Sequence, residues 1–216
     1  MHRAIDADEP VCLICGNELD PLTLICLSDC LCKGCKEQLI RHQKAYRIEN
    51  RVWYVLYEYN DFLERLWFRY KEQRDIVLAS IFLQTIQKDF FKSYCICGLP
   101  SSEKKRLERG FEPLKEVFES KNLAFYSPLY KKSDWKQNKL PLAQRKEIGS
   151  ILKHKEHYPL NGKSICLVDD VCTTGASMEA ACSVLNPKIV FVISANPKWI
   201  ERHKKEEVQI KRNPWK

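Results

Sequence analysis

The chain has 216 residues, of which 44% are hydrophobic and 30% charged, and these ordinary globular proportions argue against a disordered chain, a collagen or a coiled coil. No apolar run approaches the roughly 18 residues of a membrane-spanning helix, and the acidic N-terminus lacks the apolar core of a secretory signal. The net charge of +8 favours anionic partners such as nucleotides or nucleic acid, or it only keeps the surface solvated. We therefore expect a soluble cytoplasmic protein without membrane insertion.

A cysteine-rich segment follows residues 1–9, which we expect to form a disordered leader. Six of the eleven cysteines lie within the first 35 residues, and without an export signal they favour metal or redox chemistry over disulfides. Two CxxC pairs occur among them, a spacing that lets paired sulfurs reach one tetrahedral Zn²⁺. The predicted ligands of this structural zinc site are Cys12, Cys15, Cys32 and Cys35. Cys26 and Cys30 could each replace a ligand, although neither belongs to a CxxC pair.

Strand and helix signals alternate along the rest of the chain. Hydrophobic periodicity predicts helices at 37–47, 62–70, 75–90, 112–120, 143–153 and 174–185. Apolar or β-branched runs predict strands at 52–59, 94–97, 123–126, 164–168 and 188–195, and the basic stretch 131–139 is expected to be a loop. Near-continuous apolar strands that alternate with helices are typical of an α/β fold, in which a parallel sheet is flanked by helices on both faces.

The expected domain organisation follows from these signals. A four-cysteine zinc finger with a linker helix occupies 10–47, the α/β domain occupies 48–195, and a basic C-terminal tail occupies 196–216. The tail holds seven basic residues against three acidic ones, with two tryptophans interleaved. Basic charge with aromatic rings suits single-stranded nucleic acid, although a solvated disordered tail would have the same composition. The predicted nucleic-acid contacts are Lys198, Arg202, Lys204 and Lys205.

The segment from Ile165 to Ser177, ICLVDDVCTTGAS, carries the most chemical information. A buried strand ends in Asp169 and Asp170, and a polar loop then opens a helix. Backbone N–H groups at the start of that helix can hold a phosphate, and Gly175 permits its close approach. The two carboxylates are acceptors that suit the vicinal hydroxyls of a ribose whose 5-phosphate lies in the loop. The acidic magnesium site of a P-loop ATPase would need a GxxxxGK[ST] motif, which this chain lacks.

This segment resembles the signature of the type I phosphoribosyltransferases, which binds 5-phosphoribosyl 1-pyrophosphate (PRPP). A four-cysteine finger ahead of it resembles the ComF family of competence proteins. The segment ending in Tyr70-Lys71 and the triplet Arg109-Gly110-Phe111 match further family motifs, as does the spacing of Gln137, Leu140 and Arg145. The resemblance covers about residues 10–195, and it implies a type I phosphoribosyltransferase-like fold.

The resemblance also implies ligands and residue roles. Asp169 and Asp170 would hold the ribose hydroxyls, with Arg145 as a further catalytic anion contact and Mg²⁺ bridging ribose and pyrophosphate. The implied PRPP-binding residues are Asp169, Asp170, Val171, Cys172, Thr173, Thr174, Gly175, Ala176 and Ser177. The loop after the 94–97 strand would hold pyrophosphate through Pro100, Ser101, Ser102 and Arg109, although its basic side chains could equally form a solvated helix face.

The family's role implies a PRPP-binding protein that assists uptake of single-stranded DNA during natural transformation. Its implied partner is a ComFA-type helicase at the inner face of the membrane. An active phosphoribosyltransferase that uses a nucleobase or amine acceptor is the alternative, and a regulatory PRPP sensor is a third possibility. The chain departs from the family at Glu112-Pro113 and at Ile148, where Asn-Gln and Asn are common.

Overall fold

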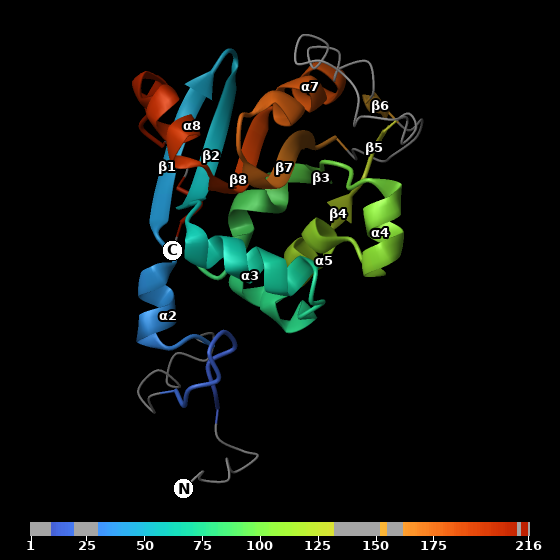
Figure 1. Cartoon of the computed structure of the whole chain (residues 1–216). Coiled ribbons are helices and arrows are strands. Elements are labelled where there is room, and N and C mark those ends of the chain that lie inside the picture. Colours follow the sequence, from blue (N-terminus) through green and yellow to red (C-terminus); the bar gives the residue numbers. More distant parts are fainter. Residues whose placement is uncertain (1–9, 20–29, 132–151, 155–161, 211–212, 216) are drawn as a thin grey trace, which may run out of the picture.

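A seven-stranded sheet forms the centre of the computed structural model, which describes residues 10–19, 30–131, 152–154, 162–210 and 213–215 (Figure 1). The strand order is β4-β3-β7-β8-β2-β1-β9. The strands are β1 (Arg41–Ile48), β2 (Arg51–Glu58), β3 (Tyr94–Gly98), β4 (Phe125–Tyr126), β7 (Ser164–Cys172), β8 (Ile189–Ala195) and β9 (Glu207–Val208). Pairing is parallel from β4 through β2 and antiparallel on both sides of β1. The predicted α/β class is confirmed, with an antiparallel addition at one edge.

Helices cover both faces of this sheet. On one face, α3 (Asp61–Lys71), α5 (Pro113–Glu119) and the 3-10 helices η1 (Ile76–Ile81) and η2 (Lys88–Ser93) pack on one hydrophobic cluster. On the other face, α7 (Ala176–Leu185) and α8 (Pro197–Arg202) pack on a second cluster. Side chains of β3 alternate between the two clusters, with Ile96 in the first and Cys95 in the second. Both faces are therefore buried, which explains the uninterrupted apolar runs of the central strands.

The predicted helix at 37–47 is wrong. The helix in this region, α2 (Lys33–Gln38), ends before β1 begins, and β1 forms a hairpin with β2 that turns at Glu49 (φ +53°). Because the aromatic strand β2 pairs with β8 on one side, it needs a second partner on the other, and β1 supplies it. Pairing between strands overrides the weak helical signal of this segment.

The predicted helix at 75–90 is also wrong, because η1 and η2 replace one long helix. Ile81, Phe82 and Leu83 are buried at three successive positions, whereas an amphipathic helix would leave one side exposed. The helix predicted at 62–70 is confirmed by α3, whose N-cap Asn60 accepts a hydrogen bond from the Leu63 amide at 2.8 Å.

Several predictions fall partly or wholly outside the described residues. The leader, residues 132–139 of the predicted loop and residues 143–151 of the predicted helix lie there, as do Cys26 and Arg145. The last two residues of that helix prediction are described, and they belong to β6 (Leu152–His154), which pairs with β5 (Leu129–Lys131). The remaining described helix is α4 (Glu103–Arg109), which follows β3. Among the described helices, none has the length and apolar character to cross a membrane.

The C-terminal segment packs against the domain rather than extending from it. After α8, η5 (Lys204–Glu206) leads into β9, which pairs with β1. Trp199 is 1% exposed and stacks on Trp53 with ring centroids 5.6 Å apart. Trp215 is 6% exposed, and its residue forms a β-bridge with Ile86. The prediction that these tryptophans stack on nucleic-acid bases is therefore wrong, because both rings belong to the core.

Replacing Trp215 with Ala should lower the free energy of unfolding by about 3 kcal/mol, because it removes a buried ring and leaves a cavity. Urea denaturation followed by circular dichroism measures the change. The control is Lys205→Ala, an exposed position in the same segment, which should stay within about 0.5 kcal/mol of the wild type. Equal stabilities of the two variants would show that the C-terminal segment does not contribute to the core.

Candidate functional site

The predicted phosphate site lies at the edge of the sheet where parallel strands end. Asp169 and Asp170 lie in the last four residues of β7, and Asp169 pairs with Val192 on β8. Both aspartates are half-buried, whereas the four residues before them are buried. A carboxylate is costly to bury without partners, so the strand reaches solvent where its acidic residues begin. Open α/β sheets hold their ligands at this edge.

The loop after β7 opens the N-terminus of α7 toward solvent. Thr173, Thr174 and Ser177 are exposed. Gly175 is buried and adopts φ +90°, and a Cβ at this position would lie 3.0 Å from Trp199 Nε1. Glycine is therefore required here both by the backbone conformation and by the neighbouring indole ring. Gly175 provides no side-chain cap for α7, although the Thr174 hydroxyl accepts from the Ala176 amide at 3.4 Å. The amides that follow in the first turn and the helix dipole can serve an anion.

Lys71, the last residue of α3, also belongs to this site. Its ammonium forms an ion pair with the Asp170 carboxylate and lies 4.6 Å from the centre of the Trp67 ring. The Lys71 and Asp170 side chains are 17% and 22% exposed, which limits screening of the pair by water. The sequence contained Lys71 only as part of a family motif. The signal that could have found it is a cation at the last position of α3, a helix that follows a parallel strand.

Backbone and hydroxyl groups fix the two aspartates. The Asp170 amide donates to Asp169 Oδ1 at 2.9 Å, and Ser194 Oγ donates to the Asp170 carbonyl at 2.9 Å. Tyr59 lies near this edge: burial raises the pKa of its hydroxyl, and the Glu64 and Asp170 carboxylates add to the rise. The site thus combines two carboxylates, one ammonium and one helix N-terminus within a single sheet edge.

The predicted pyrophosphate loop only partly joins this edge. The Leu99 amide donates to the Val168 carbonyl at 3.2 Å, which brings the Pro100, Ser101 and Ser102 loop beside the end of β7. Ser102 caps α4 by accepting from the Lys105 amide at 3.3 Å. Arg109 lies at the other end of α4, roughly 10 Å along the helix, and pairs with Glu72 at 2.5 Å with only 11% of its side chain exposed. Arg109 is thus brought away from the Pro100, Ser101 and Ser102 loop to the end of α3, where Lys71 pairs with Asp170.

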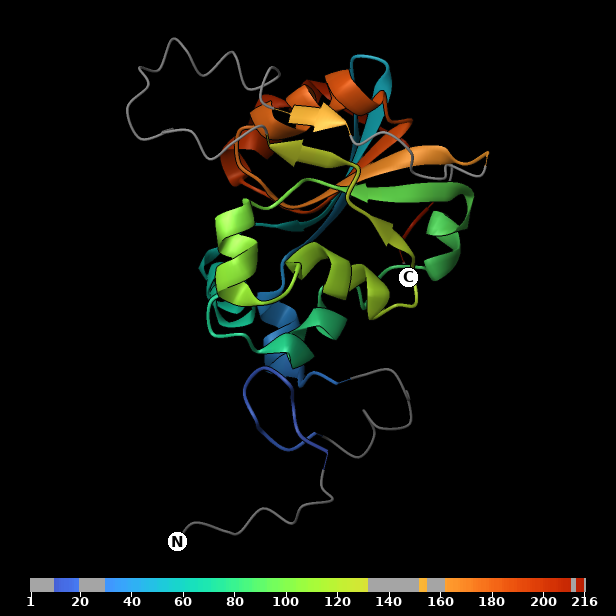
Figure 2. The same ribbon diagram turned by 90° about the vertical axis from the view of Figure 1, so that its right-hand side faces the viewer.

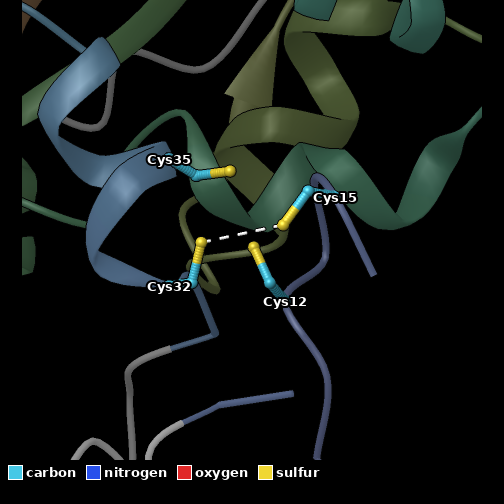
Figure 3. A group of neighbouring side chains, drawn as sticks. All are labelled: Cys12, Cys15, Cys32 and Cys35. Atoms are coloured by element: carbon cyan, nitrogen blue, oxygen red, sulfur yellow. Dashed lines mark hydrogen bonds between the residues drawn. The ribbon is translucent and has the colours of Figure 1, made fainter. Parts of the chain in front are cut away.

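The four predicted metal ligands converge on one point, as Figure 3 shows. Their sulfur atoms all lie within 4.8 Å of one another, and Cys15 Sγ lies 3.7 Å from Cys32 Sγ. Ligands placed about 2.3 Å from a tetrahedral Zn²⁺ are separated by about 3.8 Å, so the spacing fits this ion. A disulfide needs about 2.05 Å between sulfurs, which excludes one between this pair. The cluster could hold a metal ion such as zinc.

The spare cysteine Cys30 lies outside this cluster. Gln84 Nε2, in the turn after η1, donates to Cys30 Sγ at 2.6 Å, and Cys30 is not one of the four residues whose sulfur atoms lie within 4.8 Å of one another. The pKa values of the cluster's thiols shift in opposite directions. Burial opposes ionisation of Cys12, yet backbone hydrogen bonds from Cys32, Cys15 and Ile14 lower the pKa of its thiol to about 7. Burial and the neighbouring thiols raise the pKa of Cys35.

The cysteine module is fastened to the α/β domain. Arg69 on α3 donates to the Ile14 carbonyl and forms an ion pair with Asp75 at 2.7 Å. Cys12 and Cys35 belong to the same hydrophobic cluster as the buried face of α3. A metal bound here would therefore hold the N-terminal segment against the helix that presents Lys71.

The predicted nucleic-acid contacts lie on one short stretch of the C-terminal segment. All four side chains are exposed on α8 and η5: Lys198, Arg202, Lys204 and Lys205. Lys204 pairs with Glu201 at 3.5 Å, and both are largely exposed. The stretch offers positive charge for phosphates, but its aromatic residue, Trp199, faces the core.

Comparisons with known proteins indicate a specific group of relatives. The chain is 26% identical to competence protein ComFC of Bacillus subtilis over 195 residues, which cover 84% of this chain and 80% of the relative. It is 22% identical to ComFC of Streptococcus pneumoniae over 164 residues, covering 74% and 72%. A solved orotate phosphoribosyltransferase from Aeropyrum pernix aligns with 79% of this chain and 96% of its own, at 15% identity and a TM-score of 0.29. No family model matches the sequence. The two ComFC relatives confirm the resemblance to the ComF family.

The metal ligands can be tested by changing one cysteine at a time. We expect the purified chain to contain one zinc ion, and Cys32→Ser to lose it, because three thiolates bind Zn²⁺ more weakly than four. Cys30→Ser is the matched control and should retain the ion. Metal content is measured by plasma mass spectrometry. Loss of zinc from the Cys30 variant together with its retention in the Cys32 variant would contradict the ligand assignment.

Gly175→Ala should lower the free energy of unfolding by about 1–2 kcal/mol through the left-handed backbone alone, with crowding against Trp199 added. Gly34→Ala is a suitable comparison, since nothing lies within 4 Å of an added Cβ in this helical position. Alanine should leave stability there unchanged or raise it slightly. Chemical denaturation measures both variants, and an equal effect at the two glycines would argue against the Gly175 constraint.

Proposed function

We propose that this chain, which resembles the ComFC competence proteins over most of its length, binds PRPP and acts in natural competence. The observation that carries the proposal is the arrangement of β7, its loop and α7. The half-buried carboxylates of Asp169 and Asp170, the left-handed backbone of Gly175 and the N-terminus of α7 follow one another within nine residues. This combination suits a sugar phosphate better than either a purely structural turn or a simple cation site.

The 5-phosphate would lie at the start of α7. Backbone amides there carry partial positive charge, and Gly175 lets the phosphate approach the chain closely. The exposed hydroxyls of Thr173, Thr174 and Ser177 add donors on the solvent side. These groups need no rearrangement of the strand to reach a ligand, because the loop already leaves them exposed.

The ribose hydroxyls would donate to Asp169 and Asp170. The Asp170 carboxylate pairs with Lys71, so the ribose diol would compete with that ammonium. A displaced Lys71 remains near the end of β7, where it can contact the pyrophosphate oxygens from its position beside Trp67. Mg²⁺ prefers oxygen ligands, and the same two carboxylates are the residues that would hold it with PRPP.

A transfer reaction is the second candidate function. In such a reaction, pyrophosphate would leave C1 of the ribose while a nucleobase or amine attacks. The positions that depart from the family motif have structural partners in this chain: Glu112 accepts a hydrogen bond from Ser127 at 2.9 Å, and the Pro113 carbonyl accepts one from Tyr70 at 2.7 Å. Release of pyrophosphate in the presence of any one nucleobase would favour the transferase.

The competence role adds two partners. Single-stranded DNA would contact the exposed cations of α8 and η5 through its phosphates, without base stacking on Trp199 or Trp215, since both rings are buried. A ComFA-type helicase at the inner face of the membrane stays a prediction of the family resemblance. Because α8 also packs against the loop of the phosphate site through Trp199, the two binding events are measured in separate titrations.

PRPP binding is tested by calorimetric titration of the zinc-replete protein with PRPP and Mg²⁺. Asp169→Asn and Asp170→Asn should each weaken binding about 10- to 100-fold, because each removes a charged hydrogen-bond acceptor. Asp75→Asn is the matched control: it also loses a partly exposed ion pair, but outside the site. Wild-type affinity in both site variants would overturn the proposal, as would an equal loss in the control.

DNA binding is tested by fluorescence anisotropy of a labelled single-stranded oligonucleotide at increasing salt. We expect binding that weakens steeply with salt, and a shallower salt slope when Lys198, Arg202 and Lys205 are replaced by Gln. Trp199→Phe should leave the affinity unchanged, because this ring lies in the core. Absence of binding at low salt would remove the DNA contact from the account while leaving the PRPP site untouched.

A further inference from the structure

A pocket lies where the parallel strands begin, at the end of the sheet opposite to the aspartates. It is bounded by η2, the start of β3, the turn before β4 and the residue that precedes β7, and its volume is about 220 Å³. Tyr94 pairs with Ser164 where β3 and β7 begin, so this is the amino-terminal edge. Figure 2 shows η2 beside the start of β3, at the far end of the sheet from α4. The proposed PRPP site therefore does not account for this pocket.

Positive charge converges on the pocket from separate segments. Lys88 and Lys92 come from η2, and Lys163 reaches it from the turn before β7. Lys92 pairs with Asp89 at 2.8 Å, but within the described residues no carboxylate lies at ion-pair distance from Lys88 or Lys163. None of the described lining residues is acidic. The ammonium groups of Lys88 and Lys163 therefore create a positive potential that an anion relieves.

The inner wall of the pocket is apolar. Phe91, Cys95 and Leu123 line it and are each less than 10% exposed, and the half-buried Tyr94 and Tyr126 add ring surface. Small-molecule sites typically combine such an apolar wall with a few polar groups that fix orientation. A hydrated inorganic ion would use the lysines but leave this wall unfilled. The lining thus fits a molecule with one charged end and one apolar body.

The volume limits the size of that molecule. An engineered protein cavity of about 150 Å³ accommodates benzene, so a pocket of about 220 Å³ has room for a single ring and one anionic group. A complete nucleotide, with base, sugar and phosphate, is larger. We propose that this pocket binds a small phosphate monoester with a single-ring apolar body, its phosphate held by Lys88 and Lys163 and its ring against Phe91.

Phenyl phosphate is the probe, titrated into isotopically labelled full-length protein and followed by amide NMR. Saturable shifts are expected for residues 91–96 and 122–126. Residues 173–177 report separately on the phosphate site at the other edge, so either site can fail without the other. Inorganic phosphate, which lacks the ring, and phenol, which lacks the charge, should each bind this pocket at least tenfold more weakly. Equal affinity for inorganic phosphate would overturn the proposal, since it would leave only a charged surface.

Lys88→Met and Lys163→Met should each weaken the binding of phenyl phosphate about three- to tenfold, because each removes one favourable charge from a partly exposed site. Lys115→Met, an exposed lysine that pairs with Glu119 on α5, is the matched control and should not change the affinity. Ala124→Trp fills the pocket without altering its charge and should abolish the shifts. Unchanged binding in the lysine variants or in the Ala124 variant would show that the ligand lies elsewhere.

Discussion

The fold depends on one constraint. The apolar residues 165–168 of β7 are buried between two layers of helices, and the burial ends where Asp169 and Asp170 begin. Its first apolar residues alternate between the two hydrophobic clusters, and neither cluster tolerates a carboxylate without a partner. Asp169 and Asp170 must therefore lie at the strand's carboxyl edge, where water and Lys71 can reach them. Because the loop and α7 follow immediately, the same constraint places the helix N-terminus beside the carboxylates.

The segment that follows β8 packs against the end of β7 and the loop after it. Trp199 stacks on Trp53 of β2 and lies directly against Gly175, so the indole both fills the core and shapes the loop. Asn196 follows β8 and its amide donates to the Cys172 carbonyl at the end of β7. The cysteine module contacts the helix on another side of the site. Arg69 of α3 donates to the Ile14 carbonyl of that module, and α3 ends in Lys71.

Local chemistry made part of this structure predictable. The CxxC spacing identified the converging cysteines, and the order of strand, acids, glycine and helix identified β7 and α7. What could not be predicted depends on contacts between distant segments. β1 is a strand because β2 requires a partner, and Trp215 is core because Ile86 pairs with it. The ion pair of Lys71 with Asp170 joins residues 99 positions apart, which no local pattern encodes.

The central claim is that the start of α7 holds a phosphate while the end of β7 holds a ribose diol. Ribose 5-phosphate carries these two groups without the pyrophosphate, so its titration under amide NMR tests the claim most directly. The account predicts saturable shifts of the amides of residues 174–177, accompanied by a shift of the Asp170 side-chain carboxyl carbon as Lys71 is displaced. Saturable binding with unchanged resonances at these positions, or no binding at millimolar ligand, would contradict it.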